Sequence, residues 1–254
     1  MGGGQGRVMR PTPGHLVVAV VALVCGAASS AAPLRIAVAS NFQHAFETVR
    51  TSLDAPADPT YGSTGLLYAQ IMQGRTFDAF LSADRERPLK LVAQGRAFGP
   101  QVYARGSLVL LVNEDSPGPH WLTTDRRVAL ANPQTAPYGR AARQALDALG
   151  ASPRLINGLN VAQAFHFAAS GAANGAFVAL AQVTAQGIAE KRYWLLPDRL
   201  HAPIEQVAVV MHGEREAEAQ AWLAQLLGRD AQSLIGSAGY RVSGDVAGVD
   251  DSRD

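Results

Sequence analysis

The chain contains one cysteine, two lysines and almost no excess of charge of either sign. The single cysteine, Cys25, excludes an intrachain disulfide and a cluster of thiolate metal ligands. The formal net charge of +1, from 22 basic and 21 acidic residues, argues against a nucleic-acid-binding surface, which needs a basic excess. Neither Lys90 nor Lys191 lies near a glycine-rich loop, so the sequence has no P-loop for nucleotide phosphates.

Motifs of catalysis are absent as well. The sequence has no HExxH helix, no pair of carboxylates with metal spacing and no GxSxG elbow. His44 and Glu47 fall on one face of an expected helix, but two side chains do not make a metal site. We therefore predict a protein that is not an enzyme, with no catalytic residue, no cofactor and no metal ion bound directly.

The first 31 residues have the layout of an export signal. A positive start at Arg7 and Arg10 is followed by an apolar run over 16–24 and by small residues before an expected cleavage after Ala31. The apolar run is too short for a membrane-spanning helix, which needs about 20 residues. An uncleaved anchor and a lipoprotein modified at Cys25 are the alternatives. We expect a soluble, exported protein.

The remainder is long enough for a sizeable core, and short apolar runs in it alternate with amphipathic segments. This alternation indicates an α/β fold with parallel strands flanked by helices. The acidic ending at 244–254 has few bulky apolar residues, so we expect a flexible tail there. The expected strands are 34–39, 77–82, 107–112, 127–130, 175–180, 193–196 and 204–211. The expected helices are 41–53, 66–73, 88–94, 139–149, 161–170, 183–186, 216–227 and 232–238.

Polar stretches precede four of the expected helices. A helix start leaves about four N–H groups without partners and carries about half a positive charge, so it binds anions readily. The first stretch follows the strand 34–39 directly, and ligands of α/β sheets bind at the carboxyl ends of strands. Plain helix capping is the alternative for each stretch taken singly. The four stretches are 40–41, 62–65, 132–139 and 157–160.

Five blocks of sequence stand out in order: ASNF (39–42), YGSTGLLYAQI (61–71), FDAFLSAD (77–84), NPQTAPYGRAA (132–142) and SGAANGAFVALAQ (170–182). Their order and spacing resemble those of the periplasmic molybdate-binding proteins of bacterial ABC importers. The resemblance runs from about residue 34 to about residue 242. The combination is specific, although no single block is.

The resemblance implies a two-lobed type II periplasmic binding protein fold, with each lobe a mixed, mostly parallel sheet flanked by helices. The first lobe would comprise 33–106 and 208–243 and the second 107–207, with crossovers near 107–112 and 204–211. The family binds its oxyanion, molybdate or tungstate, in the cleft between the lobes and delivers it to an ABC transporter permease in the inner membrane. We expect a monomer with no nucleic-acid partner.

The resemblance also assigns ligand residues in four loops, some through side chains and some through backbone N–H groups. Relatives commonly carry a ligand tyrosine after a late strand, where this chain has Ala179, and Asn41 is the candidate for the missing donor. Molybdenum would be held only as its oxyanion. The side-chain set is Ser40, Asn41, Ser63 and Thr64, and the backbone set is Tyr138 and Val161.

These loops contain no Arg or Lys before Arg140, so we expect neutral dipoles to solvate the anion. About seven hydrogen bonds at about 1.5–3 kcal/mol each would contribute roughly 10–20 kcal/mol before desolvation costs. Nanomolar binding needs about −12 kcal/mol net, so the sums are compatible. Neutral donors suit a fully ionised oxyanion better than monohydrogen phosphate, whose proton would face a donor.

Three other hypotheses stay open at this point. The first is a binding protein of the same fold for sulfate or another small anion, which an Arg paired with the ligand would favour. The second is a periplasmic hydrolase that uses Ser40 or Ser63, although neither has an evident general base in its motif. The third is an exported α/β protein with no ligand.

Overall fold

A computed structural model of the chain describes residues 1–4, 32–54, 56–123 and 125–242. The predicted signal segment from residue 5 onward, with Cys25 and the expected cleavage point after Ala31, lies outside the described residues, as does the predicted tail at 244–254. Among the described helices, none combines the length and the apolar character that crossing a membrane requires.

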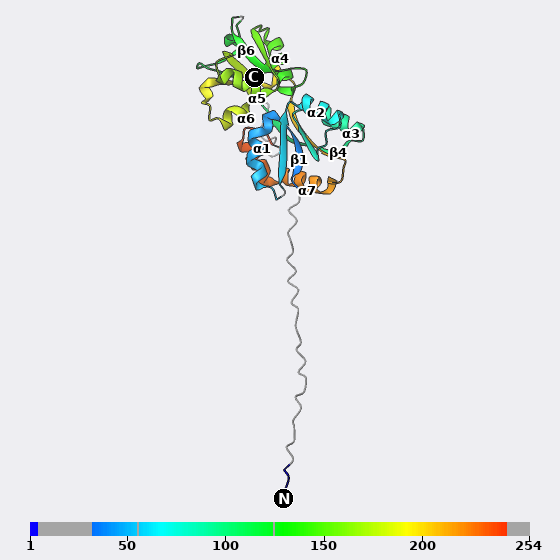
Figure 1. Ribbon diagram of the computed structural model, residues 1–254. Helices are drawn as coiled ribbons and strands as arrows, with labels where there is room; N and C mark the ends of the chain where they lie inside the picture. Colours follow the sequence, from blue (N-terminus) through cyan, green and yellow to red (C-terminus); the bar gives the residue numbers. More distant parts are fainter. Residues whose placement is uncertain (5–31, 55, 124, 243–254) are drawn as a thin grey trace. The chain divides into compact units, whose positions relative to one another are not determined.

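Strands and helices alternate along the described chain (Figure 1). The strands are β1 (Leu34–Ala39), β2 (Ala57–Gly62), β3 (Ala79–Ser82), β4 (Ala97–Gly106), β5 (Leu108–Val112), β6 (Arg127–Ala131), β7 (Arg154–Gly158), β8 (Gly175–Ala179), β9 (Tyr193–Leu195) and β10 (Ile204–Met211). The α-helices are α1 (Gln43–Val49), α2 (Thr64–Met72), α3 (Glu86–Ala93), α4 (Pro137–Leu149), α5 (Val161–Ala169), α6 (Leu180–Ala185), α7 (Glu216–Leu226) and α8 (Arg229–Ser237). A 3-10 turn, η1 (Ser40–Phe42), joins β1 to α1.

The strands form two five-stranded sheets, ordered β2-β1-β3-β10-β4 and β7-β6-β8-β5-β9. In the first sheet β1 is parallel to β2 and β3, while β10 is antiparallel to both of its neighbours. In the second sheet β6 is parallel to β7 and β8, while β5 is antiparallel to both of its neighbours. Four strands of each sheet thus share one direction, which confirms the predicted mixed, mostly parallel sheets.

The chain crosses between the sheets twice, from β4 to β5 and from β9 to β10. The antiparallel strand of each sheet, β5 or β10, is the first strand that the chain forms after crossing from the other sheet. The β10 ladder begins at Ile204, which pairs with Gly106 at the end of β4. The boundary predicted between 207 and 208 therefore falls inside β10. The first lobe is the part of the chain built on the first sheet, and the second lobe is the part built on the second sheet.

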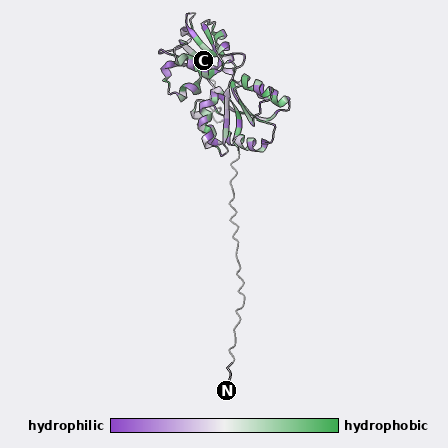
Figure 2. Ribbon diagram, viewed as in Figure 1, coloured by the Kyte–Doolittle hydropathy of each residue, from purple (hydrophilic) through white to green (hydrophobic). Residues whose placement is uncertain are grey.

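The three central strands of the first lobe, β1, β3 and β10, are buried along nearly their whole length. Because successive side chains point to opposite sides of a sheet, both faces of these strands are covered. In β1, Leu34 and Ile36 pack with residues of α1, α7 and α8, whereas Ala37 packs with residues of α2 and α3. Figure 1 shows α1 on one side of β1 and α2 with α3 on the other. Hydrophobic and hydrophilic residues both occur along these helices (Figure 2), as expected of elements that bury one face.

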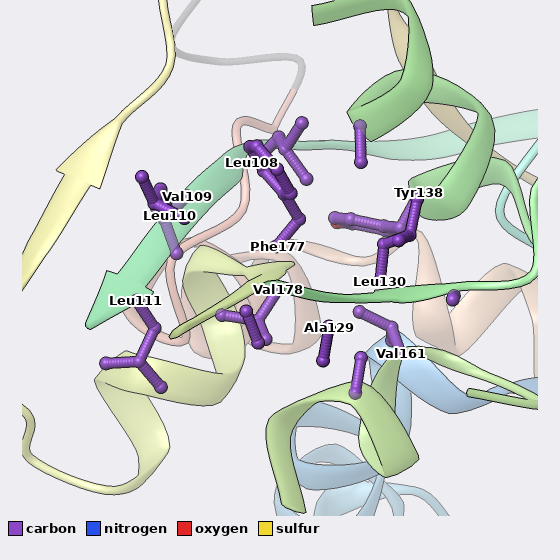
Figure 3. Close-up of a cluster of buried hydrophobic side chains, with 14 of the residues drawn as sticks. Leu108, Val109, Leu110, Leu111, Ala129, Leu130, Tyr138, Val161, Phe177 and Val178 are labelled. Atoms are coloured by element: carbon purple, nitrogen blue, oxygen red, sulfur yellow. The ribbon is translucent and has the colours of Figure 1, made fainter. Parts of the chain in front are cut away.

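The second lobe has one contiguous core around β5, whose five residues are all buried. This agrees with the lack of polar alternation in that run, which is typical of strands covered on both sides. Figure 3 shows the ring of Tyr138, from α4, beside Leu130 of β6, with Val161 on α5 in the same cluster. The core of this lobe therefore fixes the first turns of both helices.

Candidate anion site

Four helix starts meet at one small cavity. The turn η1 follows β1 and α2 follows β2, whereas α4 follows β6 and α5 follows β7, so each lobe contributes two loops from the carboxyl ends of adjacent parallel strands. All six residues predicted as ligand-binding line this cavity. The lining consists of Ala39, Ser40, Asn41, Ser63, Thr64, Ala136, Pro137, Tyr138 and Val161.

The cavity is small and its polar walls are buried. Its volume is about 10 Å³, close to the room that one water molecule needs. Ser63 is 3% exposed and Thr64 is 1% exposed. A buried polar group without a partner costs roughly 1–3 kcal/mol, so such walls favour a polar ligand over an apolar one. A tetrahedral oxyanion is larger than water, and its entry requires the two pairs of loops to separate by a hinge motion.

Two of the lining residues carry a buried hydroxyl without a hydrogen-bond partner among the described residues: Ser63, through its Oγ, and Tyr138, through a phenol that lies next to Gly106. The Tyr138 phenol reaches Gly106 at the end of β4, where a Cβ would lie 2.0 Å from the phenol oxygen. Burial raises the pKa of the Tyr138 phenol well above its ordinary range, so the group keeps its proton. Tyr138 therefore lines the cavity at the start of α4 while its ring extends toward the crossing between the lobes.

The hydroxyl of Thr64 is oriented by the end of β3. The backbone N–H of Ala83 donates to Thr64 Oγ1 at 3.0 Å. A hydroxyl has one proton of its own, and this accepted bond leaves that proton free to donate into the cavity. Ala83 belongs to the block FDAFLSAD, so the bond gives this block a physical link to the site.

The side chain of Asn41 is held from behind the cavity. Its Nδ2 donates to Gln206 Oε1 at 2.8 Å and to the Tyr240 hydroxyl at 3.0 Å. Sequence reasoning missed both partners, which lie 165 and 199 residues away along the chain. No local pattern around either residue carries a signal that could have found them.

The two helix starts of the second lobe present backbone N–H groups. In α4 the first residue, Pro137, has no N–H, so the orphan donors of the first turn begin at Tyr138. A Cβ on Gly139 would lie 2.0 Å from the carbonyl oxygen of Ala131, so only glycine allows α4 to start this close to β6. At the start of α5 the Oδ1 of Asn160 accepts from the backbone N–H of Gln163 at 3.0 Å, as an ordinary helix cap. The backbone N–H of Val161 is not used by this cap.

No charged residue is among those that line the cavity. Arg140, the first cation after the site loops, turns to the first lobe and pairs with Asp84 at 3.3 Å and Glu86 at 3.1 Å. The part of the chain that the structure describes also contains no group of three His, Cys, Asp or Glu residues that could hold a metal ion. The site can thus solvate an anion through neutral donors, as the composition of its loops predicts.

Two mixed α/β sheets with a polar cavity at their strand ends define a binding protein of the two-lobed periplasmic type, and the predicted fold class is confirmed. Residues 22–241 match the model of the family described as bacterial extracellular solute-binding protein, and the chain belongs to this family.

Among similar proteins, the molybdate-binding protein ModA of Rhodobacter capsulatus is 37% identical over 237 residues, which are 87% of this chain and 93% of that protein. ModA of Azotobacter vinelandii is 35% identical over 243 residues, 89% of this chain and 96% of that protein. The solved Azotobacter vinelandii periplasmic molybdate-binding protein matches with a TM-score of 0.74 at 33% identity, covering 82% of this chain and 99% of that one.

Proposed function

We propose that this protein is the solute-binding component of an ABC importer, and that it binds molybdate or tungstate between its lobes and delivers the oxyanion to a permease in the inner membrane. One observation carries the proposal: the four helix starts singled out in the sequence converge on a single buried, uncharged cavity. What the named relatives bind supports the choice of molybdate. The residues that line the cavity include no His, Asp or Glu to activate Ser40 or Ser63 as a nucleophile, and we infer a carrier that leaves its ligand chemically unchanged.

The proposed ligand contacts divide between the lobes. The first lobe supplies the hydroxyls of Ser40, Ser63 and Thr64, and the second lobe supplies the N–H groups of Tyr138 and Val161. Asn41 contributes its backbone N–H instead of the side-chain donor that the sequence predicts, because its side-chain amide is bonded to Gln206 and Tyr240. Each contact gains from the buried setting, because a hydrogen bond to a charged group contributes about 1.5–3 kcal/mol. Closure of the lobes brings both sets onto one anion, which is why affinity depends on the hinge.

The same donors set the proposed selectivity. Every group that faces the cavity is neutral, and the hydroxyls and N–H groups can donate. A fully deprotonated oxyanion accepts at all four oxygens, whereas monohydrogen phosphate carries a proton that meets a donor. We therefore expect molybdate and tungstate to bind far more tightly than phosphate at neutral pH.

The setting of this function follows from the export signal predicted at the start of the sequence. We propose that the protein works in the periplasm as a monomer, and that its partner is the permease. We also propose that the two lobes close on the ligand from opposite sides, and that the second lobe ends before β10, which belongs to the first sheet.

Calorimetric titration of the purified protein with molybdate, tungstate, sulfate and phosphate tests the proposal. We expect tight binding of molybdate and tungstate with a stoichiometry of one, and none of phosphate, while the titration with sulfate tests the sulfate alternative. Tight binding of sulfate without molybdate would replace the proposal with the sulfate alternative. Absence of heat with all four anions would remove the anion site altogether.

A further inference from the structure

The side-chain amide of Asn41 has no hydrogen left for a ligand. An amide NH2 group has two hydrogens, and those of Asn41 go to Gln206 Oε1 at 2.8 Å and to the Tyr240 hydroxyl at 3.0 Å. In return the Tyr240 hydroxyl donates to the backbone carbonyl of Asn41 at 2.7 Å. Tyr240 thus holds this residue at both its side chain and its backbone.

Backbone carbonyls determine which group donates and which accepts in each hydrogen bond of this network. Gln206 Nε2 donates to the carbonyl of Ile204 at 3.2 Å, so its Oε1 faces Asn41 as the acceptor. The Tyr240 proton goes to the Asn41 carbonyl, so the phenol oxygen is free to accept the amide. The side chains are all buried, with Gln206 0% exposed and Tyr240 3% exposed. Satisfied polar networks in such surroundings rigidify the groups that they join.

The network also connects the first ligand loop to the strands at the crossings between the lobes. Gln206 lies on β10, which the chain enters after its return crossing. Tyr240 is followed by Arg241, which exchanges two backbone hydrogen bonds with Arg105 of β4, at 2.8 and 2.9 Å. The β4 strand ends one residue later, where the chain leaves for the second lobe.

We propose that Gln206 and Tyr240 are positioning residues of the anion site, and that the side chain of Asn41 serves to anchor the first ligand loop to β10 and β4, while its backbone N–H faces the ligand. This inference rests on the proposed function. The network holds the loop in its binding geometry before the anion arrives, so its loss lowers affinity without removing any group that touches the ligand.

The chain offers a matched pair of variants for the test. The rings of Tyr240 and Tyr103 both pack on Phe42, with centroid distances of 5.4 and 4.9 Å. The Tyr103 hydroxyl is buried like that of Tyr240 but has no hydrogen-bond partner among the described residues. Tyr240→Phe therefore removes the two bonds to Asn41, whereas Tyr103→Phe removes a phenol oxygen from the same core and leaves the network intact.

Titration calorimetry with sodium molybdate, on the parent and each variant, gives the comparison. We expect Tyr240→Phe to raise the Kd about tenfold and Tyr103→Phe to leave it unchanged. Thermal unfolding of each variant identifies any that fails to fold, and Gln206→Met, which removes the acceptor on the other side of the amide, then replaces Tyr240→Phe with the same expected direction.

A double-mutant cycle separates positioning from a general effect on the fold. In an Asn41→Ala background, Gln206→Met should cause no further loss of molybdate affinity, because the side-chain amide that Gln206 holds is gone. An equal loss in both backgrounds overturns the inference, and so does a Tyr240→Phe variant that binds like the parent. If the parent itself does not bind molybdate, the proposed function fails and this inference fails with it.

Discussion

The backbone N–H of Gly65 donates to the carbonyl oxygen of Thr135 at 2.8 Å, which joins the second ligand loop of the first lobe to the loop before α4 in the second. A Cβ on Gly65 would lie 2.7 Å from that oxygen, closer than such atoms pack. Only a glycine lets the lobes meet at this point, immediately beside the site.

Replacing this glycine should separate affinity from stability. Gly65→Ala favours the α2 helix by roughly 0.5–1 kcal/mol, yet it pushes the Thr135 carbonyl away and keeps the lobes apart. We expect an unchanged or higher melting temperature together with a molybdate Kd raised about tenfold or more, a loss of at least about 1.4 kcal/mol. Gly236→Ala in α8 is the control, because its Cβ would make only an ordinary 3.6 Å contact with the side chain of Val242. Unchanged affinity in Gly65→Ala would show that closure does not need this contact.

Thr64 supplies a second prediction, in which the hydroxyl is tested apart from the shape of the side chain. Thr64→Val keeps the volume but removes both the donor to the anion and the acceptor for the Ala83 N–H. We expect a loss in binding free energy of about 1.5–3 kcal/mol and a loss in unfolding free energy of about 1–3 kcal/mol. Thr64→Ser keeps the hydroxyl and should retain most of the affinity. Calorimetry and urea unfolding measure both effects, and a valine variant that binds like the parent would place the donor elsewhere.

Arg140 leads to a prediction about ionic strength. Its pairs with Asp84 and Glu86 cross between the lobes, and the side chains of Arg140 and Glu86 are 42% and 49% exposed. Pairs of this exposure contribute about 0.2–1 kcal/mol and weaken with salt. Arg140→Gln should release molybdate a few times faster than the parent at low salt, and stopped-flow traces of the two should converge at high salt. Lys191→Gln, which removes an exposed pair with Asp115 inside the second lobe, should have no effect on release.

The carboxylate of Glu86 should make a small contribution to stability that depends on pH. Hydrogen bonds from Lys90, and after it Arg140, lower its pKa from an ordinary 4.5 to about 2. A folded-state pKa below the unfolded value means that the stabilisation is complete above 4.5 and is lost as the pH falls toward 2. The difference in unfolding free energy between the parent and Glu86→Gln should therefore be constant near neutrality and shrink in acid. A difference that does not change with pH would contradict this origin.

The strands that sequence analysis overlooked are β2, β4 and β7, and all three are edge strands. The expected strands at 34–39 and 204–211 coincide with β1 and β10, which are covered on both faces and so read as apolar runs. An edge strand pairs on one side only and tolerates polar residues and proline. Pro59 in β2 and the Gly99-Pro100 pair in β4 are residues that usually indicate a turn, so the sequence pattern did not predict strands there.

The cavity residues were predictable because their signal is local, a polar helix start directly after a strand. Ser40 follows β1 without a gap, and Thr64 opens α2 one residue beyond Ser63. The support behind them is long-range. Gln206 lies in an apolar strand and Tyr240 lies beyond the last helix, and nothing in their own neighbourhoods indicates that they meet at Asn41. Contacts of this kind follow from topology, which a single sequence does not show.

The central place of β10 has a consequence for the order in which the chain folds. Because β10 lies between β3 and β4, the first sheet is split until residues 204–211 have been synthesised, long after its other strands. The second lobe is built from one continuous stretch and has no such gap. A growing chain can therefore complete the later half before the earlier one, and the cavity to which both lobes contribute is among the last parts of the molecule to assemble.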